Sequence, residues 1–74
     1  MQVAASVIFN RMKSAEKVRL IMANEGSVAH YAYGLYANEL DLLGVPDAEK
    51  FSVMKEVRRL AEVEYTARSA ESVF

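Results

Sequence analysis

The chain has 74 residues, enough for one domain at most, and a chain of this length buries only a modest share of its surface when it folds alone. It has no Cys and one His, which excludes disulfides and thiolate metal sites and argues against a His-based metal site within one chain. Hydrophobic residues make up 53 %, above the roughly 45–50 % that is usual for soluble domains. We therefore expect apolar surface beyond what one small core uses, available to a partner or a second copy.

The net charge of −1 is unevenly distributed along the chain. Residues 1–19 hold four bases and one acid, residues 20–49 hold five acids and no base, and residues 50–74 hold five bases and four acids. We interpret this pattern as a basic first segment lying beside an acidic middle segment. The alternative is a basic patch for nucleic acid or for an acidic partner.

The first predicted helix covers residues 2–25. Apolar residues recur there at steps of three and four, as at Ile8, Met12, Val18 and Met22, and neither Pro nor Gly interrupts them. Ser14 could cap a new helix and divide the segment near residues 10–14. A single helix, bent there, is the favoured interpretation, with Gly26 just past its end.

The second predicted helix covers residues 27–43, with Ser27 as its N-cap and Gly44 just past its end. Two apolar stripes predict neighbours on two sides of this helix, and Tyr33 and Tyr36 are assigned to the core. Val45 is expected to supply the hydrophobic contact of this helix end, and the proline that follows it prevents the helix from continuing.

The third predicted helix covers residues 47–70, with Asp47 as its cap. Residues 69–74 are expected to fray. The predicted fold is a single all-α domain over residues 1–74, a three-helix bundle or helical hairpin arrangement that dimerises. Its third core stripe comprises Phe51, Met54, Val57, Leu60 and Ala61.

Catalytic chemistry finds no support in the sequence. His30 and Asp41 lie on one predicted helix, roughly 16 Å apart at 1.5 Å per residue, so they cannot form part of a triad there. No glycine-rich phosphate loop or metal-binding signature is present. We predict that the protein is not an enzyme and holds neither a cofactor nor a metal.

The predicted partner-binding face is the narrow strip left between the apolar stripes of residues 27–43. Tyr side chains give large contact area at low entropy cost, and a Gly inside a helix permits the close approach of another helix. The strip and the tyrosine beside it comprise His30, Tyr31, Gly34, Asn38 and Asp41.

Nucleic acid is the alternative partner. The order helix, Gly turn, helix around residue 26 resembles a helix-turn-helix, but the second helix carries no Lys or Arg for phosphate contacts. The better electrostatic candidate is the basic side of the first helix, extended by two arginines of the third. These residues are Arg11, Lys13, Lys17, Arg19, Arg58 and Arg59.

No uncharged run reaches the ~20 residues of a membrane span, the longest being residues 26–38. The basic, amphipathic residues 2–22 are assigned to the core and not to a lipid surface. We expect a small cytoplasmic, non-enzymatic adaptor, inhibitor or regulator that binds another protein through its tyrosine-containing helix and self-associates. The alternative is a dimeric nucleic-acid-binding transcriptional regulator that uses the basic face of the first helix.

Overall fold

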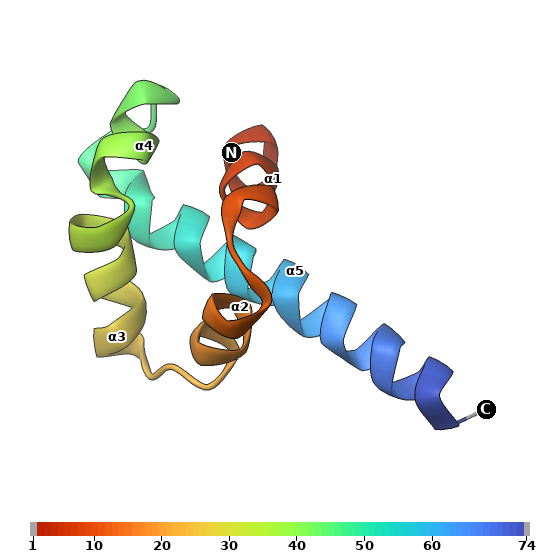
Figure 1. Cartoon of the computed structure of the whole chain (residues 1–74). Helices are drawn as coiled ribbons and strands as arrows, with labels where there is room; N and C mark the ends of the chain where they lie inside the picture. The colour runs from red at the N-terminus through yellow and green to blue at the C-terminus, as the bar shows by residue number, and fades with distance from the viewer. Residues whose placement is uncertain (1, 74) are drawn as a thin grey trace.

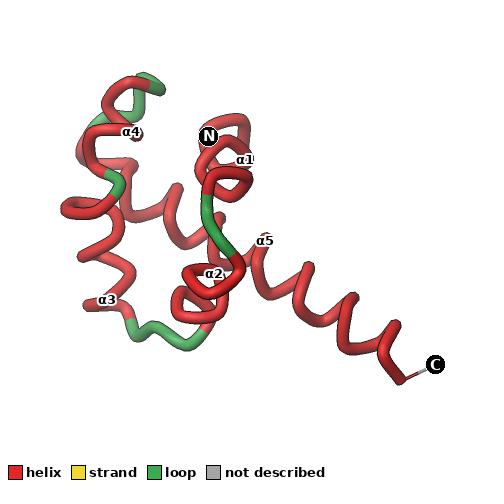
Figure 2. Tube along the Cα trace, viewed as in Figure 1, coloured by secondary structure: helices red, strands yellow, loops and turns green. Residues whose placement is uncertain are grey.

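A computed structural model describes the backbone of residues 2–73 and the side chains of residues 3–67. The all-α prediction is confirmed, with no strand among the residues described. The helices outnumber the three predicted, because two of the predicted helices are interrupted (Figures 1 and 2). In chain order they are α1 (Gln2–Arg11), α2 (Ser14–Ile21), α3 (Glu25–His30), the π-helical turn η1 (Tyr31–Leu35), α4 (Ala37–Leu42) and α5 (Asp47–Val73).

The favoured single helix over residues 2–25 is wrong, and the division near Ser14 is right. Lys13 takes an extended backbone with ψ of 158° and occupies the N-cap of α2, without a side-chain capping hydrogen bond. The break lets both short helices pack against α5. It also turns α2 so that Leu20 is buried, while Val18 and Met22, which were expected in the core, are exposed.

The start of the second helical segment also differs from the prediction. Asn24, not Ser27, is the N-cap of α3, since its side-chain Oδ1 accepts the backbone N–H of Ser27 at 2.8 Å. Gly26 therefore lies in the first turn of α3 and does not end the preceding helix. An Asn side chain satisfies an otherwise unpaired N–H at a helix start as well as a Ser does, so the residue type alone does not favour Ser27 over Asn24.

The segment from α3 to α4 contains a π turn, in which the Tyr36 N–H donates to the Tyr31 carbonyl at 2.9 Å. Four of its residues, spaced by four, are buried in a row: Val28, Ala32, Tyr36 and Leu40. In a regular α-helix such a row drifts by about 40° per step, since a turn takes 3.6 residues. The wider π turn offsets this drift and keeps the row on the core.

The end of this segment is as predicted. Gly44 has a φ of +80°, the left-handed conformation that favours glycine. The Val45 N–H donates to the Leu40 carbonyl and the Gly44 N–H to the Asp41 carbonyl, which is the Schellman pattern. Val45 is buried, so the turn also supplies the expected hydrophobic contact.

The long helix α5 is the support for the rest of the chain. It packs against α1, α2, α3 and η1, and the Lys17–Glu64 ion pair at 3.2 Å extends its contact with α2 into its second half. Beyond α2 the helix projects from the other described helices (Figure 1). The predicted stripe of α5 is confirmed by burial of Met54, Val57 and Ala61, joined by Val53. The helix continues to Val73; the predicted fraying of residues 69–74 concerns side chains outside the described part of the chain.

Candidate interaction surfaces

An open groove lies between the C-terminal end of α2 and the α3–η1 segment, and we call it the α2–α3 groove. Two large apolar side chains on it are unusually exposed, Met22 at 81 % and Leu35 at 61 %. Exposed apolar side chains that gather on a concave surface mark binding sites more often than scattered ones do. The residues that line it are Arg19, Met22, Ala23, Asn24, Gly26, Ser27, His30, Tyr31 and Leu35.

Aromatic contacts link the wall of this groove to α2. The Tyr31 ring stacks on Tyr36 with centroids 6.3 Å apart, and the buried Tyr36 hydroxyl donates to Glu16 Oε2 of α2 at 2.6 Å. Burial, and then this carboxylate, raise the pKa of the Tyr36 hydroxyl, so that it stays a donor. Tyr33, which was also expected in the core, is instead half exposed, because it follows the buried Ala32 directly and lies about 100° from it around the helix.

The structure brings only part of the predicted partner-binding strip into this groove. His30 and Tyr31 line it, whereas Gly34, Asn38 and Asp41 do not. Gly34 is exposed, and a methyl group there would touch only the His30 ring, at 3.4 Å. No segment of the described chain therefore requires a glycine at this position, and its role against another subunit stays a prediction.

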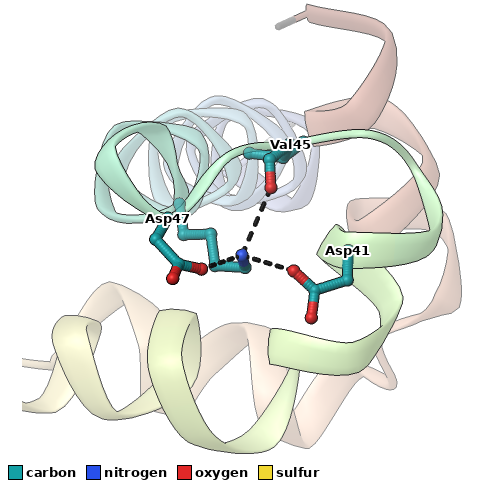
Figure 3. Close-up of polar contacts among 4 residues, drawn as sticks. Asp41, Val45 and Asp47 are labelled. Atoms are coloured by element: carbon teal, nitrogen blue, oxygen red, sulfur yellow. Dashed lines mark hydrogen bonds and ion pairs between the residues drawn. The ribbon is translucent and has the colours of Figure 1, made fainter.

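Asp41 belongs to a different cluster, centred on a buried lysine (Figure 3). The Lys50 ammonium contacts the carboxylates of Asp41, at 2.5 Å, and Asp47, and donates to the Val45 carbonyl at 3.2 Å. The Lys50 side chain is only 2 % exposed. A buried ammonium needs such partners, and here they join the end of α4 to the start of α5.

Hydrogen bonds to Asp41 and Asp47 raise the pKa of Lys50, so the ammonium stays protonated. This cluster was missed at the sequence level. Asp47 and Lys50 are three residues apart in the first helical turn, which is a recognisable pairing distance. Asp41 lies on another helix, nine residues before Lys50, so no pattern within one helix predicts its contact with the lysine.

Most of the predicted nucleic-acid-binding residues are engaged within the chain. Arg11 pairs with Glu39 at 3.2 Å, a contact between the basic first segment and the acidic middle one, while Asp41, Asp47 and Glu25 of the middle segment pair with lysines of α5. Lys17 pairs with Glu64 and lies over the Phe9 ring, Arg58 donates to the Ala23 carbonyl, and Arg59 binds Glu56. Among the six, only Lys13 and Arg19 have no partner in the described part of the chain.

Among the residues that the structure describes, no helix is long and apolar enough to cross a membrane, and no group of three or more His, Asp and Glu side chains could hold a metal ion. Comparison with known proteins identifies no relative: no family model, no curated protein and no solved structure matches the chain.

Proposed function

We propose that this is a small cytoplasmic, non-enzymatic protein that binds another protein through the α2–α3 groove and acts as an adaptor, inhibitor or regulator, with self-association as part of its action. The observation that carries the proposal is the exposure of Met22 and Leu35 on the groove that Tyr31 also lines. Large apolar and Tyr side chains of this kind supply most of the energy at protein interfaces.

The chemistry of the groove defines the partner. Its apolar walls suit an aliphatic or aromatic side chain presented by a helix or a turn, and the ordered Tyr31–Tyr36 stack reduces the entropy lost on binding. Arg19 at the edge has no partner in the described chain, so it favours a segment with an acidic flank. His30 also lines the groove and offers its imidazole nitrogens to a polar group of the partner.

The test compares Leu35 with Leu42, which is 86 % exposed on α4 but lies outside the groove. A photo-cross-linking amino acid at position 35 should capture one partner in the native cell, and the same group at position 42 should not. With that partner purified, Leu35→Asp should weaken binding by about tenfold or more, as expected at an interface hot spot. Leu42→Asp should leave the affinity unchanged, and equal losses in the two variants would contradict the proposal.

A further inference from the structure

A small cavity, separate from the α2–α3 groove, lies where α2 packs against α5. Its volume is about 140 Å³, and no residue lines both sites. The wall from α2 comprises Ser14, Lys17, Val18 and Ile21, and the wall from α5 comprises Ala61, Glu64 and Tyr65. Both sets follow the i, i+3, i+4 pattern that puts side chains on one face of a helix. We call this site the α2–α5 cavity.

The cavity exists because a small residue of α5 faces α2 at this level. Ala61 is only 2 % exposed and forms the floor, whereas the larger Val57 is fully buried one turn earlier. Val18 and Tyr65 are 40 % and 56 % exposed, so they flank the opening. The cavity therefore has an apolar floor and opens to solvent between an aliphatic side chain and an aromatic ring.

The charged groups of the cavity already neutralise each other. Lys17 of α2 and Glu64 of α5 form an ion pair at 3.2 Å, and the Lys17 ammonium also lies 3.9 Å from the centre of the Phe9 ring. A charged ligand would have to break this pair to gain a partner, and it would also have to leave water for a mostly apolar space. The lining therefore favours an uncharged ligand.

The size and the remaining polar groups narrow the class of ligand. A cavity of about 150 Å³ holds one molecule of benzene, so a single ring with a small substituent suits this one. The exposed Tyr65 ring offers an aromatic contact to such a molecule. Ser14 and Tyr65 also line the cavity with hydroxyls that make no hydrogen bond within the described part of the chain.

We propose that the α2–α5 cavity binds a small, uncharged aromatic molecule that carries a hydroxyl group, such as a phenol with one ring. The ring occupies the apolar space above Ala61, beside Tyr65, and the hydroxyl stays at the opening near Ser14. This binding activity goes beyond the proposed function, because it uses a different site and needs neither a partner protein nor a second copy.

The first test titrates the isotope-labelled full chain with para-cresol and follows the amide signals by NMR. We expect saturable shift changes centred on residues 14–21 and 61–65. Benzoate and benzylammonium are rings of similar size that carry a negative and a positive charge. Each should bind at least about tenfold more weakly than para-cresol, because the cavity offers no unpaired charge to either.

The second test changes the cavity itself. Ala61→Leu fills the space above the floor and should abolish para-cresol binding without lowering the melting temperature, since a cavity-filling residue adds contacts. Tyr65→Ala should raise the dissociation constant about tenfold, because it removes the aromatic contact. Tyr65 is exposed, so this variant tests the site even where Ala61→Leu disturbs the fold. Tyr33→Ala is the matched control: Tyr33 is 52 % exposed, lies outside the cavity and should leave the affinity unchanged.

Four outcomes overturn the inference: no saturable binding of para-cresol up to its solubility limit, shift changes centred outside the two walls, equal affinity for the charged compounds, or a loss in Tyr33→Ala as large as in Tyr65→Ala. These measurements use the chain alone and do not involve the α2–α3 groove. Partner binding in Leu35→Asp is measured separately, so failure of one proposal does not hide failure of the other.

Discussion

Lys50 and Tyr36 hold their protons more tightly in the folded protein than in the unfolded chain. Hydrogen bonds to Asp41 and Asp47 raise the pKa of Lys50 above its ordinary 10.5, and burial with the Glu16 contact raises the pKa of Tyr36 above its ordinary 10.0. A group whose pKa is raised on folding stabilises the protein fully below its unfolded-state pKa. It loses that contribution as the pH rises through its folded-state value.

We therefore expect the free energy of unfolding to be steady near neutral pH and to fall above about pH 10. Urea unfolding at a series of pH values measures this. Tyr36→Phe should be less stable at neutral pH by about 1–2 kcal/mol, because it loses a hydrogen bond to a carboxylate, and its alkaline decline should be shallower.

Tyr33→Phe is the matched control, since Tyr33 is half exposed and makes no hydrogen bond among the described residues. It should change the free energy of unfolding by less than about 0.5 kcal/mol. An alkaline decline as steep in Tyr36→Phe as in the parent would show that the Tyr36 phenol does not contribute to it.

At the scale of the helices, the caps decide where each one begins. Asn24→Ala should destabilise the protein by about 1 kcal/mol, because it leaves the Ser27 N–H without its acceptor. Ser27→Ala should cost much less, since the Ser27 side chain caps nothing in the structure. Thermal or urea unfolding of the two variants measures the difference, and a larger loss in Ser27→Ala would contradict the assigned cap.

How far the sequence predicts this fold depends on the range of the interactions involved. The Gly44 turn was predictable because a left-handed glycine, a buried Val45 and the following proline are all local signals. The break at Lys13 could be predicted only as an alternative, because the N-cap residue Lys13 makes no side-chain hydrogen bond to the first turn of α2 and so gives no capping signal. The Glu16–Tyr36 bond joins residues far apart in sequence, and no pattern within one helix announces it.

The candidate site was predictable to a similar degree. His30 and Tyr31 do line the α2–α3 groove, and the excess of apolar residues indicated that exposed apolar surface would exist. The exposure of Met22 was not foreseen, because it depends on where α2 ends. The ion pair between Asp41 and Lys50 could not be predicted, because it depends on how α4 packs against α5.

At the scale of the whole molecule, charge argues against the nucleic-acid alternative. The net charge is −1, and Arg11, Lys17, Arg58 and Arg59 are held by contacts within the chain. We expect no measurable binding of random duplex DNA at low salt by fluorescence anisotropy, since even non-specific binders show a strong electrostatic contribution there. Tight, salt-sensitive binding that Lys13→Ser with Arg19→Gln abolishes would instead support the alternative.

The molecule is elongated. The chain measures 42 × 23 × 17 Å, and the long dimension follows α5 (Figure 1). None of the described residues that line the α2–α3 groove belongs to α5, so the groove is part of the compact body and not of the projecting helix.

The π turn has a consequence for how this chain tolerates changes in length. Deleting Gly34 would change the spacing of the buried row Val28, Ala32, Tyr36 and Leu40 from four, four and four to four, three and four. That is the spacing of an ordinary α-helix with the same side chains on the core. The segment is in effect a regular helix carrying one additional residue. That residue is accommodated by the π turn, which places Tyr36 on the core where a regular helix would place Leu35, and leaves Leu35 exposed to solvent and any binding partner.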